Sequence, residues 1–427
     1  GVLVNPLTGE LTKKEDEKKK LFYFLKGTEP HVDNNYDFDS VFKDDNIEIK
    51  QHNDVKRVQR PQNTKKKNSA KTVLSRVGIS FLTFLLAIVM LALCADIIVL
   101  HGTSESARDR FVLTVTETSA AGFLATWFLS DETVESIINN NAIVDSSGQT
   151  DPTLIKLPDG ENDENNGDEP VDINSVQLID IEGKTYKGKL LIVQNPKRVY
   201  IGTPAAYGND KEGVTTLNMV KNDNALYGIN GGGFYDTDTG KGNGGIPTGR
   251  ENSSGIVISK GVLMYGSKSR EYEVIGINKQ GVLVLGKMTA QQALDSGVVE
   301  ALNFGPYLVM NGKACEVGGF TEAGLNPRTA IGQRADGAML LLTIDGRQPS
   351  SMGATYEDLI EIMMNYGAVN AANLDGGSST YMAQNQESEN NPQIITQCAS
   401  LYGPRKMATS ILVSRADQIN TQYEQGN

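Results

Sequence analysis

The 427-residue chain carries a formal net charge of −12, and hydrophobic residues make up 39% of it. This apolar fraction is enough for a folded core, and the length suits one large domain with extensions, or two domains. No basic stripe with interleaved aromatic residues occurs beyond the N-terminal segment, which argues against a nucleic-acid binder.

The chain begins with a polar segment, residues 1–76, that we predict to be a largely disordered cytoplasmic tail with a basic balance. We predict a transmembrane helix at residues 77–100, because the run from Ile79 to Ala95 is uncharged and about 20 apolar residues cross the hydrocarbon layer. The alternative, a buried helix of a soluble core, is disfavoured because such long helices keep a polar face. Lys and Arg gather before the helix, at residues 56–76. The positive-inside rule then predicts a single-pass membrane protein whose later residues are extracellular.

Three further segments follow the predicted membrane helix. Residues 101–144 are predicted to form an extracytoplasmic helical stalk, with a helix-start signal at residues 130–133. Residues 145–175 contain nine acidic side chains against the single basic Lys156, and we predict an acidic flexible linker there. The remaining residues, 176–427, are predicted to be one folded domain.

The predicted domain is rich in short apolar runs separated by glycine-containing turns. The runs lie at residues 190–193, 255–259, 262–265, 274–277, 282–285, 307–310 and 338–344. The turns Lys260-Gly261, Gln280-Gly281 and Asn311-Gly312 are typical of hairpins. One helix is expected after Thr355, which forms a capping-box pattern with Asp358. The fold class predicted is therefore α+β, with mixed, mostly antiparallel sheets and a few packed helices, preceded by one transmembrane helix.

Histidine and cysteine are rare in this chain, and their positions restrict the possible catalytic mechanisms. The three histidines, His31, His52 and His101, all precede the predicted domain, so a catalytic triad with histidine is excluded there. Acid–base chemistry must then come from Asp, Glu, Tyr or Lys. Cys315 and Cys398 either form a disulfide or remain two free thiols.

Four glycine-bearing segments are candidates for a site: residues 228–235, 326–332, 341–347 and 373–380. An Asp-Gly pair is usually only a turn. Two such pairs directly after apolar strands are more informative, because the end of a strand places its last side chain at the rim of a sheet.

A hairpin links two of these segments. If its turn is centred between Ala335 and Asp336, Arg328 lies opposite Thr343 and is a diagonal neighbour of Asp345 on one face. Such an arginine would be either a structural ion-pair partner or a phosphate ligand beside a held carboxylate. A bulge of one residue would destroy this register.

The same segments resemble a known family. Asn-Gly-Gly, Asn-Pro-Arg-Thr, Asp-Gly-Arg and Asn-Leu-Asp-Gly-Gly-Ser-Ser, in this order, are similar to the motifs of phosphodiester glycosidases over about residues 225–415. The family's commoner Gly-Gly-Gly-Ser reads Gly-Gly-Ser-Ser at residues 376–379 here. Residues 404–410 differ from the usual ending, so no role is carried onto them. The tail, membrane helix and linker resemble those of bacterial members.

The resemblance implies a hydrolase that cleaves a sugar-phosphodiester bond, here in cell-envelope or extracellular glycopolymers. Asp345, Asp375 and Arg328 would be catalytic, because glycoside cleavage usually needs two carboxylates. Substrate would contact Asn230, Gly231, Gly232, Thr329, Gly346, Gly376, Gly377, Ser378 and Ser379. No cofactor is required, although a divalent cation between Asp345 and Asp375 is an alternative left open. The competing hypothesis is a non-catalytic domain that binds polysaccharide in exopolysaccharide assembly or anchoring.

Overall fold

The structure is a computed structural model, and it describes residues 3–4, 11–12, 70–116, 121–141, 148–157, 172–236, 242–250, 253–316, 324–386, 390–400 and 402–418. It divides into two units, residues 1–73 and 74–427. In the first unit, β1 (Leu3–Val4) and β2 (Leu11–Thr12) form an antiparallel pair. Residues 1–2, 5–10 and 13–69 of the predicted tail, and residues 145–147 and 158–171 of the predicted linker, lie outside the described residues.

The predicted membrane segment is one long helix, α2 (Ala70–His101). An 18-residue window within Leu74–His101 has a mean hydropathy of 2.7, and the stretch is long and apolar enough to cross a membrane. Three shorter helices follow: α3 (Glu105–Thr116), α4 (Phe123–Thr126) and α5 (Asp131–Asn140). The helix start predicted at residues 130–133 is confirmed, because the Ser130 side chain accepts a hydrogen bond from the Thr133 N–H.

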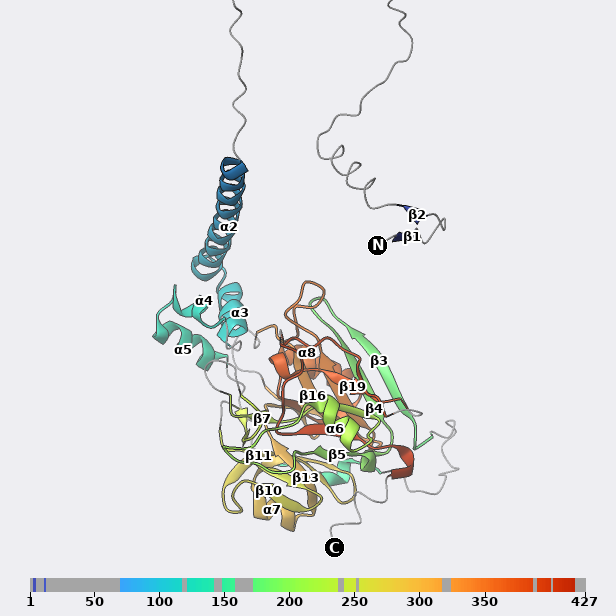
Figure 1. The fold of residues 1–427 in the computed structure, drawn as a ribbon. Helices are drawn as coiled ribbons and strands as arrows, with labels where there is room; N and C mark the ends of the chain where they lie inside the picture. The colour runs from blue at the N-terminus through green and yellow to red at the C-terminus, as the bar shows by residue number, and fades with distance from the viewer. Residues whose placement is uncertain are drawn as a thin grey trace, which may run out of the picture. The chain divides into compact units, whose positions relative to one another are not determined.

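The remaining strands form three large sheets and one small pair (Figure 1). The seven-stranded sheet has the order β15 (Lys313–Ala314), β14 (Tyr307–Met310), β18 (Ala368–Leu374), β16 (Arg328–Arg334), β17 (Met339–Ile344), β4 (Lys187–Val193) and β3 (Val176–Glu182). One five-stranded sheet has the order β20 (Gln393–Ile394), β19 (Met382–Gln384), β6 (Tyr227–Asn230), β21 (Ser410–Val413) and β5 (Val199–Gly202). The other has the order β10 (Val262–Tyr265), β9 (Val257–Ser259), β13 (Val298–Asn303), β11 (Glu271–Asn278) and β12 (Leu283–Thr289). Strands β7 (Gly233–Phe234) and β8 (Pro247–Thr248) pair separately.

Helices cover the outer faces of these sheets. On the seven-stranded sheet, α8 (Tyr356–Asn365) packs its apolar stripe against residues of β14, β17 and β18. The opposite face of that sheet shares one core with both five-stranded sheets. Helices α6 (Thr216–Asn222) and α7 (Ala290–Asp295) pack into two smaller clusters beyond them. The described 3₁₀ turns are η2 (Pro152–Leu154), η3 (Pro196–Arg198), η5 (Gly377–Ser379) and η6 (Ala416–Gln418).

The predicted fold class is confirmed, and every described strand pair is antiparallel. The predicted hairpin turns at Lys260-Gly261, Gln280-Gly281 and Asn311-Gly312 join β9 to β10, β11 to β12 and β14 to β15. The capping box at Thr355 and Asp358 starts α8, as expected from the sequence.

The two five-stranded sheets are connected by a buried carboxylate. Glu300 on β13 accepts hydrogen bonds from the N–H of Ile201 on β5, at 3.0 Å, and from the N–H of Lys260, at 2.9 Å. Burial raises the pKa of this carboxyl to about 7, although both N–H groups oppose the rise. The two hydrogen bonds fix β5 beside the β9–β10 turn.

The predicted linker is wrong for residues 149–156. The Thr150 N–H donates to the Leu285 carbonyl at 3.0 Å, and the Lys156 N–H donates to the Ala335 carbonyl at 2.7 Å. Gln149 also forms a bridge with Gly286. These backbone contacts join the segment to the domain, and the acidic, polar composition of the region gives no sign of them.

Cys315 and Cys398 are both free thiols. Cys315 belongs to the main core, whereas Cys398 packs against the cluster around α6. The free-thiol alternative is therefore the one that the structure supports.

Candidate active site

The central strand order brings two Asp-Gly turns to one edge of the seven-stranded sheet. Strands β17 and β18 are both antiparallel to β16, which lies between them. They therefore run in the same direction, and Asp345 and Asp375 follow their C-terminal ends. Two inter-strand spacings, about 10 Å, separate the two backbone positions.

Pro327, just before β16, lies between the two turns. An added Cβ at Gly346 would lie 2.6 Å from the Pro327 nitrogen, and one at Gly376 would lie 2.8 Å from the Pro327 carbonyl oxygen. The Gly377 N–H donates to that oxygen at 2.8 Å, with Gly377 at φ +60°. Only glycine allows both turns to pass so close to this segment.

The Asp375 backbone joins three of the four glycine-bearing segments. Its N–H donates to the Gly231 carbonyl at 3.0 Å, and its carbonyl accepts from Asn230 Nδ2 at 2.5 Å. The Thr329 hydroxyl donates to Asn230 Oδ1 at 2.6 Å. Asn230 and Thr329 are both buried, and their hydrogen bonds fix the position of the Asp375 turn.

Gly231 and Gly232 are held on their other side by Thr409. The Gly231 N–H donates to the Thr409 carbonyl at 3.0 Å, and the Gly232 N–H donates to its hydroxyl at 2.9 Å. These contacts fix the conformation of the glycine segment. Both N–H groups are thereby occupied within the protein.

The Asp375 carboxyl is a weaker acid than an ordinary aspartate side chain. Burial raises its pKa to about 6, and the nearby Asp236 charge contributes to the rise. Hydrogen bonds from the Ser379 side chain and the Gly376 N–H, with the positive charge of Arg405, act in the opposite direction. A carboxyl with such a pKa can exchange protons near neutral pH, which a catalytic acid or base requires.

Arg405 connects Asp236 to the loop that follows Asp375. Its guanidinium lies 2.6 Å from an Asp236 oxygen, and its other terminal nitrogen donates to Ser378 Oγ at 3.3 Å. The guanidinium carbon also lies 4.6 Å from the centre of the Phe234 ring. The pair is partly shielded from water, which strengthens its charge interactions.

A second guanidinium, that of Arg347, also lies close to this loop. An added Cβ at Gly377 would lie 3.0 Å from Arg347 Nη2, and the same nitrogen donates to Asn326 Oδ1 at 3.2 Å. Two arginines therefore approach the Gly376–Ser379 loop from different elements. Guanidinium groups and loop amides are the usual ligands of a phosphate group.

Three of these charged residues were missed from sequence. Arg347 belongs to the recognised Asp-Gly-Arg motif, and its place directly after Asp345-Gly346 was a usable signal. Asp236 closely follows the glycine segment, but nothing around it points to a site. Arg405 lies in the segment that was given no role, 169 residues from the Asp236 that it contacts.

Arg328 does not lie where the hairpin prediction placed it. The observed register pairs Arg328 with Ile344, and Thr329 with Thr343, so the prediction is wrong by one residue. The reason is the turn: the Gly337 N–H donates to the Arg334 carbonyl with Gly337 at φ +89°, which makes the loop one residue longer than assumed.

The shift places Arg328 on the opposite face from Asp345. Its guanidinium carbon lies 4.2 Å from the centre of the Tyr356 ring at the start of α8. Its nitrogens donate to the carbonyls of Gly324, at 2.9 Å, and Ala354, at 3.3 Å. These contacts describe a structural arginine that is almost fully buried.

Asp345 has its own surroundings at the edge of the sheet. Its Oδ1 accepts a hydrogen bond from the Gln397 N–H at 2.9 Å. Burial raises the pKa of its carboxyl, while this hydrogen bond and the charge of Lys189 lower it. Among the described residues, no group of three or more His, Cys, Asp or Glu side chains is arranged to hold a metal ion. The cation considered at Asp345 and Asp375 therefore gains no support.

Residues 223–414, which contain this site, match the family model described as phosphodiester glycosidase. This part of the chain is therefore a domain of the phosphodiester glycosidase family.

Individual relatives agree with the family match. The N-acetylglucosamine-1-phosphodiester alpha-N-acetylglucosaminidase of Bos taurus is 28% identical over 199 residues, which are 43% of this chain and 36% of that protein. The mouse protein of the same name is 26% identical over 252 residues, 54% of this chain and 46% of its own length. The SPbeta prophage-derived uncharacterized protein YomE of Bacillus subtilis is 29% identical over 203 residues, 44% of this chain and 28% of that protein. This chain thus spans less than half the length of each of these relatives.

Among solved structures, the zebrafish N-acetylglucosamine-1-phosphodiester alpha-N-acetylglucosaminidase catalytic domain, auto-inhibited by its pro-peptide, has a TM-score of 0.42 and 22% identity. The match covers 56% of this chain and 82% of that one.

The raised pKa of Asp375 predicts a gain in stability when its charge is removed. Above pH 6 the folded state must hold a buried carboxylate, whereas the unfolded chain holds it at its usual pKa of 3.8 without penalty. Asp375→Asn should therefore raise the free energy of unfolding at pH 8 by up to about 3 kcal/mol, since one pKa unit is worth about 1.4 kcal/mol. The gain should vanish below about pH 3, where wild type is protonated in both states. Urea unfolding at the two pH values measures this, with the exposed Asp180→Asn as the control. Equal stability of wild type and variant at pH 8 contradicts the prediction.

Proposed function

We propose that this domain hydrolyses a glycosyl-1-phosphodiester, releasing a free sugar and a phosphomonoester, with cell-envelope or extracellular glycopolymers as its substrates. The observation that carries the proposal is the Asp375 carboxyl, with a pKa of about 6, beside a glycine loop approached by Arg347 and Arg405. The family match over residues 223–414 and the activity for which the mammalian relatives are named support the same reaction class.

In the proposed reaction, the two guanidinium groups and the loop amides bind the phosphate, whose single negative charge they complement. Asp375 acts as the general base and takes a proton from water as the water oxygen bonds to the anomeric carbon. The bond between the anomeric carbon and the phosphate oxygen breaks, and the phosphomonoester leaves with both electrons of that bond. A phosphate leaving group needs little protonation, so one carboxyl can suffice for proton transfer. Asp236 holds Arg405 in place through its ion pair.

The general-base role predicts the pH dependence of hydrolysis. Because the base must be ionised, kcat/KM should rise with pH through about 6 and then level off. Above pH 6, Asp375→Asn should lower kcat by at least about 100-fold, the lower range for loss of a general base, and the difference from wild type should shrink as the pH falls below 6. The assay is release of free sugar from methyl diesters of N-acetylglucosamine-1-phosphate, glucose-1-phosphate and galactose-1-phosphate. Equal measurable rates for wild type and Asp375→Asn would contradict the general-base role, and no release of sugar by wild type from any diester would contradict the proposed hydrolysis.

Arg405 and Arg328 should respond to substitution in opposite ways. Arg405→Lys keeps the charge but loses the forked donor geometry, so kcat/KM should fall by about 100-fold, the scale for one lost donor at a developing charge. Arg328→Lys loses the stack on Tyr356 and a carbonyl contact, so it should lower the free energy of unfolding by about 1–3 kcal/mol. Its kcat/KM should stay within a few-fold of wild type. Denaturant unfolding and diester kinetics on the same preparations test both statements. A larger kinetic loss in Arg328→Lys than in Arg405→Lys is the contrary result.

We further propose that α2 anchors the domain on the outer face of a cell membrane. The support is the apolar stretch Leu74–His101 and the basic residues between 56 and 76, which should remain in the cytoplasm. Protease added to intact cells that express the chain should digest an epitope placed after residue 418 and spare one placed at the N-terminus. Protection of the C-terminal epitope until the cells are lysed is the result that contradicts this orientation.

A further inference from the structure

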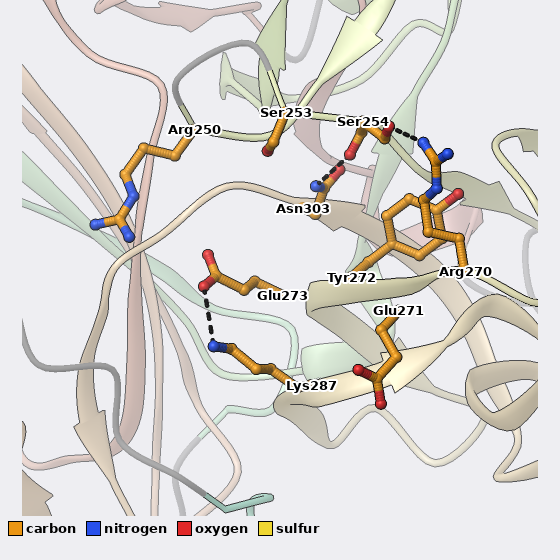
Figure 2. A pocket seen from close by; sticks show the side chains of 9 residues that line it. All are labelled: Arg250, Ser253, Ser254, Arg270, Glu271, Tyr272, Glu273, Lys287 and Asn303. Carbon is orange, nitrogen blue, oxygen red and sulfur yellow. Dashed lines mark hydrogen bonds and ion pairs between the residues drawn. The ribbon is translucent and has the colours of Figure 1, made fainter.

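A polar cavity of about 410 Å³ lies on the β11–β12–β13 sheet, beside the loop that carries Arg250 (Figure 2). Its volume falls within the range of about 300–1,000 Å³ that small-molecule sites occupy. Tyr272, Glu273 and Lys287 come from neighbouring strands, and the buried Asn303 ends β13. These elements are not the ones that hold the Asp375 carboxyl.

The walls present hydrogen-bond donors and acceptors of both charge signs. Glu273 and Lys287 face each other across the β11–β12 register, with an oxygen and a nitrogen 3.7 Å apart. Arg250 also lines the cavity, and in Figure 2 its side chain lies apart from the others, on the side toward which the Glu273 carboxylate and the Lys287 amine point. Such walls suit a ligand whose groups both donate and accept hydrogen bonds.

The base of the cavity is held firmly. Asn303 Oδ1 accepts from the Ile256 N–H at 2.9 Å, and its Nδ2 donates to the Ser254 carbonyl at 3.0 Å. Arg270 donates to the Ser254 hydroxyl. The loop of residues 253–256 is thereby tied to β13, so this side of the cavity exists before any ligand binds.

Two backbone segments connect this cavity to the candidate active site. An added Cβ at Gly232 would lie 2.9 Å from the Asn303 carbonyl oxygen, and the adjoining Gly231 accepts the Asp375 N–H. An added Cβ at Gly305 would lie 3.3 Å from Glu273 Oε2. The Gly305 N–H donates to the carbonyl of Asn373, two residues before Asp375, at 3.2 Å. Single glycine segments therefore connect the lining of the cavity to the backbone of the Asp375 turn.

We propose that this cavity binds a second, neutral sugar residue of the glycan whose phosphodiester is cleaved at Asp375; its identity as part of the substrate rests on the proposed function. Sugar hydroxyls each donate and accept hydrogen bonds, as these walls require. The carboxylates of Glu271 and Glu273 offset two of the three cationic side chains in the lining, which leaves little net charge to bind a second phosphate. An acyl chain is a poor fit too, because it would leave these polar groups without partners. The domain thus recognises an oligosaccharide, not only the sugar that it releases.

The test separates binding from hydrolysis. Full-length Asp375→Asn is immobilised in detergent, and its affinity for N,N′-diacetylchitobiose, lactose and maltose is measured by surface plasmon resonance. At least one of these neutral disaccharides should bind, and Glu273→Gln and Arg250→Gln added to this background should each raise its Kd by about tenfold, the effect of one weakened hydrogen bond to a charged group. Glu182→Gln, an exposed carboxylate on β3, is the matched control and should leave the Kd unchanged.

The outcomes distinguish the two proposals. The cavity proposal is overturned if no disaccharide binds, or if both cavity variants bind as tightly as the Asp375→Asn parent. This holds even when wild type hydrolyses the diesters. If a disaccharide binds through the cavity while wild type hydrolyses no diester, the proposed function fails and the sugar site stands. With wild-type Asp375, the cavity variants should raise KM for a diester bearing an additional sugar and leave kcat unchanged. Unchanged melting temperatures of the variants confirm that they are folded.

Discussion

The candidate site depends on one constraint: β16 lies between β17 and β18, and both of these strands are antiparallel to it. Because β17 and β18 both run against it, their ends meet at one sheet edge, where Pro327 separates the two Asp-Gly turns. The turns can approach Pro327 only because Gly346 and Gly376 lack side chains. A buried sheet with α8 on one face and two sheets on the other holds this geometry rigidly. The loop beyond Asp375 is therefore held in a fixed shape by its packing against Pro327.

Electrostatics at this edge oppose stability. Burial of the Asp375 carboxyl disfavours its ionised form, and the Asp236 charge adds to that penalty. Arg405 offsets part of it, yet the same guanidinium is shared with Asp236 and with Ser378. A core built for stability alone would omit this carboxyl. Its presence in a cluster of charges from separate elements is typical of sites that need a shifted pKa for chemistry.

The sequence predicted the elements well and the contacts between them poorly. Apolar periodicity and glycine turns located β9 to β12 and the hairpin of β16 and β17, because these signals are local. The register of that hairpin depended on one positive-φ residue, Gly337, and an error of one residue moved Arg328 to the wrong face. Arg405 and Asp236 were not found, because contacts over such a separation arise from the packing of whole sheets. The turns at Asp345 and Asp375 were placed correctly at a sheet edge, since each directly follows an apolar strand.

Glycine is required at residues 231–233 for a different reason from the glycines of the two Asp-Gly turns. Its residues have no room for side chains on any side: Thr409 lies against Gly231, the end of β13 against Gly232, and Phe304 and Thr248 against Gly233. The segment is thus a thin wall between the Asp375 turn and the cavity around Asn303. A thicker wall would push the two apart, and adjoining units of one glycan could not then occupy both. The sequence pattern identified these glycines as candidate site residues beside Asp375. Their packing against the end of β13 depends on tertiary contacts, so it could not be predicted from the sequence.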